Sequence, residues 1–278
     1  MTKARRQNNK YCILLATDFV APKFGGVETH SYKLAQCLIE LGHKVIMVSS
    51  MQNYCREGVR VMANGLKIYH LPLLPIWRGD VGFFAPLNII SVLRQIFIRE
   101  HVDICHGHLS TSITMAMVLV AAKSYGIKTV FTEHAHFNYK DLGMIHVNKI
   151  CKWYLKDVDA AICVSHACKE NFTLRAKINP HKCFTIPNAV DTIKFSPNPS
   201  LRYPLNTINI VCMSRMSANK GLDFLIDIIP EVLSVHPNAY FILGGDGEKK
   251  ALLEELIRKK GLQNNVELLG GLPHDKVP

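Results

Sequence analysis

The sequence contains no Cys-x-x-Cys pair, no secretory signal and no apolar run long enough to cross a bilayer. Its nine cysteines are scattered and odd in number, which favours reduced thiols over a disulfide framework or a zinc ribbon. The apolar run after the basic start ends at Asp18, too early for a signal peptide. The longest uncharged apolar run, Leu109–Ala122, is shorter than the roughly 20 residues of a transmembrane helix. It is therefore expected to form a buried helix.

Acidic residues are scarce in the first 205 positions, which carry 25 Lys and Arg but only 13 Asp and Glu. Residues 206–278 are nearly neutral, with 8 basic and 9 acidic groups. This asymmetry favours an anionic partner for the first part: phospholipid head groups, a phosphorylated substrate or nucleic acid. Nucleic acid is the least favoured, because no basic run is interleaved with aromatic residues. Solubility alone is the other explanation.

Short apolar runs alternate with longer segments whose apolar residues recur every three or four positions. The predicted buried strands are 11–17, 44–49, 66–71, 102–105, 128–131 and 160–164. The intervening segments, such as Val27–Leu41 and Leu87–Arg99, have the pattern of amphipathic helices. This alternation predicts parallel strands joined by right-handed crossovers, the doubly wound α/β class.

The proline-containing stretch 186–203 interrupts the alternation and is interpreted as a linker. Strands and helices resume from Ile208. The sequence therefore predicts two Rossmann-like doubly wound domains. Their boundaries are a basic N-terminal arm at 1–10, a first domain at 11–190, a linker at 191–206 and a second domain at 207–278. We expect the second domain to be incomplete at its C-terminus, because further strand–helix units would follow Pro278.

A double glycine, Gly25 and Gly26, lies between the first predicted strand and the helix that follows it. Glycine leaves room for a phosphate to approach the main chain, and the helix start directs free N–H groups at that anion. A simple tight turn is the alternative. The sequence has no G-x-G-x-x-G fingerprint here and no Walker lysine, which weakens a dinucleotide or ATP interpretation.

Two cations, Arg215 and Lys220, follow the first strand of the second predicted domain. In a loop at the carboxyl end of a strand, a guanidinium fork and a flexible ammonium suit a diphosphate. A solvated loop would explain the pair equally well in isolation. The double glycine occupies the equivalent turn of the first domain, so we expect the two sites to face each other across a cleft.

Two histidine pairs follow predicted strands: His106 and His108 in "HGH", and His134 and His136 in "HAH". Alternate residues at a strand end share a face, so a zinc hydrolase that uses them with Glu133 is one interpretation. No further ligand type at metal spacing accompanies them, and the glycines and the Arg–Lys pair would then have no role. We therefore expect no metal, and His106 is interpreted as a wall of the cleft.

Several segments together resemble the retaining, nucleotide-sugar-dependent glycosyltransferases of family 4, which have the two-Rossmann GT-B fold. They are "FGGVETH", "TEHAH", "VSHACKEN", "IPNAVDTIKFSP", "SRMSANKGLDFLIDIIPEV" and "LGGDGEKK". The resemblance extends from about Tyr11 to the end. Within the family, "AQCLIELGHKV" and "DIIPEV" favour the branch that transfers N-acetylglucosamine from UDP-GlcNAc to phosphatidylinositol, the first step of glycosylphosphatidylinositol anchor biosynthesis.

By this resemblance, Arg215 and Lys220 would hold the donor diphosphate and offset charge on the departing UDP. Gly25 and Gly26 would leave space for the diphosphate and the transferred sugar. The family needs no metal, because the basic pair supplies the positive charge.

The same resemblance places His134 against the sugar near the reacting carbon. Glu28 and His106 are possible substrate contacts, although Glu28 in the first helical turn also complements the helix dipole. An aromatic stretch with Trp77, Phe83 and Phe84 is a candidate contact with lipid head groups.

The implied partners are UDP-GlcNAc, phosphatidylinositol, the membrane surface and the other subunits of the transferase complex, on the cytosolic face of the endoplasmic reticulum membrane. Family members carry two glutamates eight positions apart later in the second domain, and this branch has a membrane-anchoring helix nearer the C-terminus. Neither occurs before Pro278. Two alternatives stay open: another family 4 lipid or polysaccharide glycosyltransferase, and a truncated, non-catalytic isoform that binds the same partners.

Overall fold

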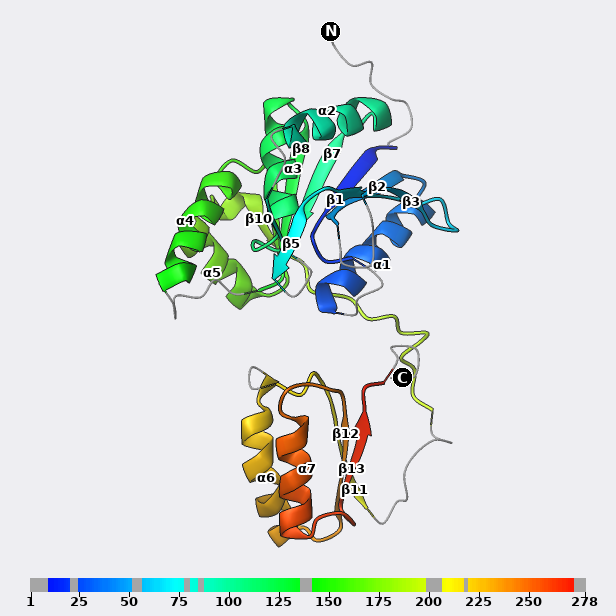
Figure 1. The fold of residues 1–278 in the computed structure, drawn as a ribbon, viewed down its shortest axis with the longest axis vertical. Coiled ribbons are helices and arrows are strands. Elements are labelled where there is room, and N and C mark those ends of the chain that lie inside the picture. Colours follow the sequence, from blue (N-terminus) through cyan, green and yellow to red (C-terminus); the bar gives the residue numbers. More distant parts are fainter. Residues whose placement is uncertain are drawn as a thin grey trace. The chain divides into compact units, whose positions relative to one another are not determined.

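The computed structural model divides the chain into two compact units, Met1–Ala189 and Val190–Pro278 (Figure 1). It describes residues 10–20, 25–51, 57–77, 81–84, 88–135, 142–198, 207–217 and 220–272. At 74–77, 81–84, 142–144 and 146–147 the backbone alone is described. Residues 1–9 of the predicted arm and 199–206 of the predicted linker lie outside the described residues.

The first unit is built on an eight-stranded sheet in the order β10-β9-β8-β7-β1-β2-β4-β3. Neighbouring strands are parallel, except that β3 runs antiparallel to β4. The strands are β1 Cys12–Ala16, β2 Lys44–Ser50, β3 Gly58–Val61, β4 Lys67–Leu71, β7 Ile104–His108, β8 Lys128–Glu133, β9 Ala160–Cys163 and β10 Cys183–Thr185. A separate antiparallel ribbon comprises β5 Leu74–Trp77 and β6 Val81–Phe84.

Helices cover both faces of this sheet. They are α1 Gly26–Glu40, α2 Ile89–Glu100, α3 Ile113–Ser124, α4 Leu142–Leu155 and α5 His166–Ala176, followed by the short 3-10 helix η1 Pro180–Lys182. The faces of β1 show the division: Leu14 packs into the core shared with α2 to α5, whereas Leu15 packs into the core beneath α1. Alternate strand residues point to opposite faces, so this two-sided burial produces the nearly continuous apolar run of β1.

The second unit has a three-stranded parallel sheet in the order β11-β12-β13. Its elements are β11 Ile208–Met213, α6 Leu222–Val235, β12 Ala239–Gly244, α7 Lys250–Lys260 and β13 Val266–Gly270. Both helices lie on the same side of the sheet (Figure 1). Ile229 of α6, Phe241 of β12 and Leu253 of α7 are buried together in one apolar cluster.

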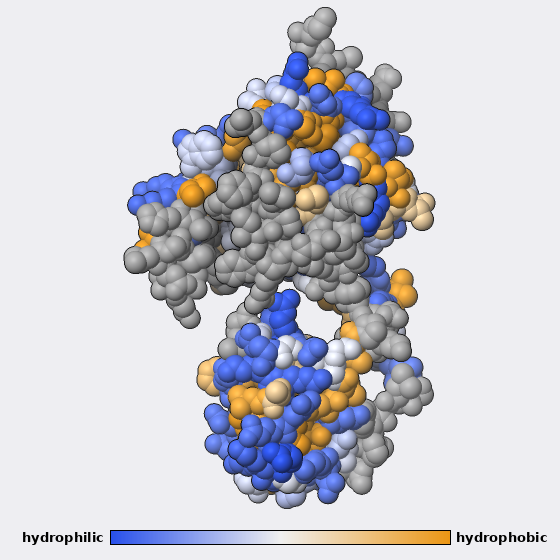
Figure 2. Space-filling view, in the orientation of Figure 1, coloured by the Kyte–Doolittle hydropathy of each residue, from blue (hydrophilic) through white to orange (hydrophobic). Residues whose placement is uncertain are grey.

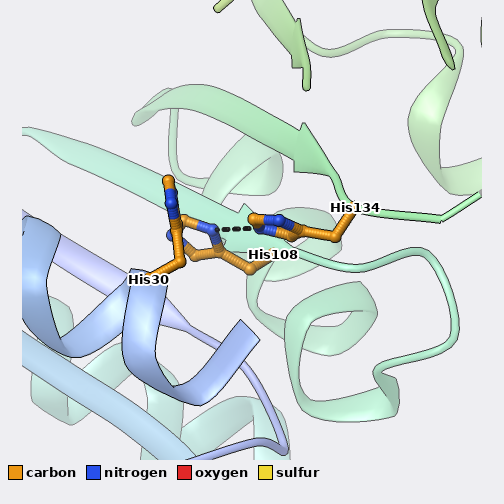
Figure 3. Close-up of side chains that lie close together, drawn as sticks. All are labelled: His30, His108 and His134. Carbon is orange, nitrogen blue, oxygen red and sulfur yellow. Dashed lines mark hydrogen bonds between the residues drawn. The ribbon is translucent and has the colours of Figure 1, made fainter. Parts of the chain in front are cut away.

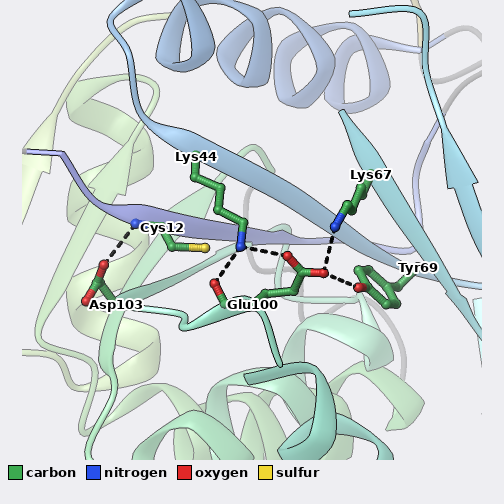
Figure 4. Close-up of polar contacts among 6 residues, drawn as sticks. All are labelled: Cys12, Lys44, Lys67, Tyr69, Glu100 and Asp103. Atoms are coloured by element: carbon green, nitrogen blue, oxygen red, sulfur yellow. Dashed lines mark hydrogen bonds and ion pairs between the residues drawn. The ribbon is translucent and has the colours of Figure 1, made fainter. Parts of the chain in front are cut away.

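At the amino-terminal end of the first sheet, a buried carboxylate joins three elements (Figure 4). Lys44 Nζ lies 2.8 Å from Glu100 Oε2, Lys67 Nζ lies 3.0 Å from Oε1, and the Tyr69 hydroxyl donates to Oε1. Burial raises the pKa of Glu100, but these partners outweigh it and lower that pKa to about 2. The network ties the end of α2 to β2 and β4, on the edge opposite to the strand ends that carry the histidines.

Among the described helices, none is both long enough and apolar enough to cross a membrane. Leu109–Ala122, predicted as a buried helix, contributes most of α3, where Val118 and Leu119 are buried. The visible face of the second unit is mainly hydrophilic over α6 and α7, with apolar side chains between the polar ones (Figure 2).

Candidate active site

The carboxyl edge of the first sheet brings together the start of α1, the end of β7 and the turn after β8. β1 and β7 are neighbours in the sheet, and the chain continues from them to helices on opposite faces. Doubly wound folds bind ligands at this switch point. The side chains that these three segments place there are therefore the candidates for a site.

Gly25 and Gly26 form the start of α1, in different surroundings. Gly25 caps the helix in an extended conformation, φ −164° and ψ 169°. A Cβ added at Gly25 would overlap the carboxylate of Glu28, which folds back over the helix start. A Cβ at Gly26 would meet no described atom within 4 Å. Gly26 therefore leaves open space beside the first N–H groups of α1, where an anion can approach.

Four imidazoles cluster beside this helix start (Figure 3 shows three of them). His106 and His108 are buried on β7, and their rings stack with centroids 4.3 Å apart. His106 Nε2 lies 2.7 Å from Thr132 Oγ1, and His108 Nδ1 lies 3.2 Å from His134 Nε2. His30 of α1 completes the cluster, with its ring edge-on to His134 at 4.8 Å between centroids. His136 lies outside the described residues.

Burial keeps these imidazoles uncharged at neutral pH. It lowers the pKa of His106 to about 3 and that of His134 to about 4, and it also lowers the pKa values of His30 and His108. The neighbouring imidazoles further lower the pKa values of His106, His108 and His134. At pH 7, His134 can therefore donate or accept a hydrogen bond with a sugar hydroxyl, but it does not contribute a positive charge.

Glu133 lies on the opposite side of β8 from His134, because successive strand residues alternate in direction. Its Oε1 accepts hydrogen bonds from the backbone N–H groups of His134 (3.0 Å) and Ala135 (3.1 Å). Its Oε2 is buried and has no hydrogen-bond partner among the described residues. Burial raises the pKa of Glu133 to about 7. Glu133 holds the turn that carries His134, and it is not placed as a base beside the imidazoles.

Asp18 is a buried residue of this edge that no sequence motif marked as functional. Its backbone N–H donates to Ser112 Oγ (3.0 Å), and its Oδ2 accepts from the N–H of Ile113 (2.8 Å). The Thr114 hydroxyl donates to Oδ1. Burial raises the pKa of Asp18 although these hydrogen bonds oppose the shift. Asp18 thus fixes the end of β1 to the start of α3.

In the second unit, Arg215 and Lys220 are exposed in the loop between β11 and α6. Residues 218 and 219 lie outside the described residues. The Lys220 N–H donates to Ser217 O at 3.0 Å, which closes the loop on itself. The two cations are thus on one loop at the carboxyl end of a parallel strand, where a diphosphate can bind.

The "GGDG" segment, 244–247, supports this loop through its backbone. Ser214 N–H donates to Gly244 O (3.0 Å), and Met216 N–H donates to Asp246 O (2.9 Å). Gly245 and Gly247 have φ values of 137° and 156°, and a Cβ at either would overlap the carbonyl of Ser214 or of Met216. This supporting role is not visible in the sequence, because a Gly-Gly-Asp-Gly run is also typical of a plain turn.

Both units match known glycosyltransferases. Residues 24–194 match the family model Glycosyltransferase Family 4, and residues 198–278 match Glycosyl transferases group 1. A subunit of phosphatidylinositol N-acetylglucosaminyltransferase from Arabidopsis thaliana is 44% identical over 271 residues, which cover 96% of this chain and 59% of that protein. Its human counterpart of the same name is 42% identical over 265 residues, 95% of this chain and 54% of that protein. The chain thus spans little more than half the length of these curated relatives.

Solved structures share the fold at low sequence identity. Sucrose-phosphate synthase from Thermosynechococcus elongatus matches with a TM-score of 0.70 at 15% identity, over 96% of this chain and 72% of that one. Anabaena HepE, in complex with UDP and glucose, matches with a TM-score of 0.67 at 18% identity, over 95% of this chain and 70% of that one. These likenesses confirm the predicted α/β fold of the GT-B type. Since the family model covers more than half of the sequence, the chain belongs to glycosyltransferase family 4.

Proposed function

We propose that the protein is a UDP-GlcNAc-dependent hexosaminyltransferase. It transfers N-acetylglucosamine to phosphatidylinositol with retention of configuration, the first step of glycosylphosphatidylinositol anchor biosynthesis. The observation that carries this proposal is the sequence identity to two proteins that are named as the same subunit of that transferase. The identity is 44% over 96% of this chain for one and 42% over 95% of this chain for the other.

The chemistry of the two units supports the proposal. The departing UDP gains negative charge as the sugar leaves, and Arg215 and Lys220 supply two exposed positive charges on one loop of the second unit. In the first unit, Gly26 leaves space for the diphosphate and sugar, and neutral His134 hydrogen-bonds the sugar near the reacting carbon. Glu28 and His106 are further candidate contacts with the substrates. No metal is needed for this transfer, since the cationic pair takes its place.

The partners and location follow from the same relatives. Two of them are named as subunits, and we propose that this chain likewise assembles with the other subunits of the transferase complex. It works on phosphatidylinositol at the cytosolic face of the endoplasmic reticulum membrane, with its basic first part toward the anionic surface. The side chains of Trp77, Phe83 and Phe84, the candidate lipid contacts, lie outside the described part. Nucleic acid is not among the proposed partners.

The test is direct synthesis of the product. The chain is co-expressed with the other subunits in cells that lack their own copy of this component, and membranes are supplied with labelled UDP-GlcNAc and phosphatidylinositol. Labelled N-acetylglucosaminyl phosphatidylinositol, with an α linkage seen by NMR, is the expected product. Arg215→Ala and Lys220→Ala should each lower kcat/KM by an amount worth on the order of 2–4 kcal/mol, as for other lost groups at developing charge.

Arg258→Ala is the matched control, because Arg258 is an exposed cation in the last turn of α7. Its activity should equal that of the parent. Equal activity of Arg215→Ala and the parent would remove Arg215 from the site. Assembly of a complex without any product would favour the non-catalytic alternative, and transfer to a different lipid or sugar would favour another activity of family 4.

A further inference from the structure

His30, His108 and His134 come from three separate segments and converge on one point (Figure 3). One ring nitrogen of each lies within 4.8 Å of the corresponding nitrogens of the other two. His108 Nδ1 and His134 Nε2 are already 3.2 Å apart. In a tetrahedral site with Zn–N bonds of about 2.0–2.1 Å, two ligand nitrogens lie roughly 3.3 Å apart. The first pair therefore already has the separation of two zinc ligands, and a ring nitrogen of His30 lies within 4.8 Å of both.

The surroundings of the three rings also favour a metal ion. His108 is fully buried, and its Nδ1 faces His134 Nε2. His30 and His134 are only partly buried, so the convergence point is accessible from solvent.

The donor set selects the class of ion. Three imidazoles without a carboxylate suit zinc, copper or nickel and do not suit magnesium or calcium, which require oxygen ligands. His106 is not part of this group: its Nε2 pairs with Thr132 Oγ1 at 2.7 Å, and the three nitrogens that converge belong to His30, His108 and His134. Glu133 directs its carboxylate to the backbone of the following turn, so a hydrolytic zinc centre would lack its base.

From this geometry we infer that the chain binds one zinc ion through His30, His108 and His134. Because the ion occupies a ring nitrogen of His134, bound zinc and sugar transfer exclude each other, and zinc is an inhibitor. The binding site stands independently of the proposed function, whereas the inhibition rests on the role proposed for His134.

The binding is tested by titrating zinc chloride into the metal-free full chain in a calorimeter at neutral pH. One zinc ion per chain is expected for the parent, and magnesium chloride should give no heat of binding. His30→Gln, which keeps the bulk of a partly exposed side chain, should weaken zinc binding at least tenfold. The matched control is His181→Gln, at an exposed histidine of η1, which should bind zinc as the parent does.

Circular dichroism without zinc shows whether each variant is folded. His134→Gln, also at a partly exposed position, should lose zinc binding as His30→Gln does. If the parent binds no zinc, or if folded His30→Gln and His134→Gln both retain the parent's affinity and stoichiometry, the site is refuted.

The inhibition is tested with the assembled transferase, as the ratio of turnover with zinc to turnover without zinc in each variant. The ratio should fall in the parent and stay near one in His30→Gln, and added UDP-GlcNAc should relieve the inhibition in the parent. Undiminished turnover of the zinc-saturated parent would refute the exclusion. Zinc binding by a chain that never transfers sugar would instead refute the proposed function and leave the metal site intact.

Discussion

Replacing Glu133 by glutamine removes a buried charge while the side chain keeps its shape. Burial raises the pKa of Glu133 to about 7 from its ordinary value of 4.5. The folded chain therefore holds the Glu133 proton more tightly than the unfolded chain does. The stability that this proton contributes is fully present below pH 4.5 and is lost as the pH rises through 7. At about 1.4 kcal/mol per pKa unit, Glu133 alone should lower the free energy of unfolding by roughly 2–3 kcal/mol between about pH 5 and pH 8.

The assay is denaturant unfolding of parent and Glu133→Gln at several pH values in this range, followed by tryptophan fluorescence. Both tryptophans, Trp77 and Trp153, belong to the first unit, so the signal reports that unit alone. The variant should become more stable relative to the parent as the pH rises. The lowered pKa values of the clustered histidines act in the opposite direction, but they are common to both proteins and cancel in the difference.

Glu170→Gln provides the control, since Glu170 is an exposed carboxylate on α5. The difference in free energy of unfolding between Glu170→Gln and the parent should stay constant across the pH series. The reasoning fails if the difference between Glu133→Gln and the parent is also constant over the same pH range. Such a result would show that Glu133 ionises in the folded chain as readily as in the unfolded one.

Three further changes test other parts of the structure. Gly26→Val should abolish sugar transfer without unfolding the first unit, because the new side chain fills open space; unchanged UDP-GlcNAc affinity in a calorimeter would contradict this. Gly245→Ala should destabilise the second unit by about 2–4 kcal/mol in thermal unfolding, because its Cβ overlaps the Ser214 carbonyl, whereas Gly261→Ala should cost only about 1 kcal/mol. Glu100→Gln should destabilise the first unit by about 2–3 kcal/mol near neutral pH. The lowered pKa of Glu100 means that this penalty should shrink as the pH falls toward 2, and a penalty independent of pH would exclude the charge as its cause.

Most of the fold was predictable from the sequence, because strands buried on both faces leave unbroken apolar runs. Cys12–Ala16 and Lys44–Ser50 are of this kind, and the predicted ranges differ from them by one or two residues. The predicted range for β7 ended too early, because the strand continues through His106 and His108, which are polar although they are buried. β3 was missed because all four of its residues are exposed at an antiparallel edge, and its apolar alternation is limited to Val59 and Val61 on either side of Arg60.

The candidate site was only partly predictable. Spacing along a strand placed His106 and His108 on one face, but it could not show that His30, far away in the chain, meets them from α1. That contact depends on the order of the strands in the sheet, in which β1 lies beside β7. The local sequence pattern predicts strands but does not predict their order. Glu133 and Asp18 act through backbone N–H groups, and such hydrogen bonds leave no trace in residue spacing.

The loop that carries Arg215 is held to "GGDG" by main-chain atoms. Ser214 and Met216 bond to it through their backbone N–H groups, and Lys249 N–H returns a bond to Met216 O at 3.0 Å. Because no side chain takes part in these bonds, the path of the loop does not depend on the side chains of Ser214 and Arg215, whereas Met216 is buried in the apolar cluster of this unit. The shape of the loop is therefore set by its partner segment: Gly245 and Gly247, where a Cβ would overlap the Ser214 and Met216 carbonyls, fix the position at which Arg215 is displayed.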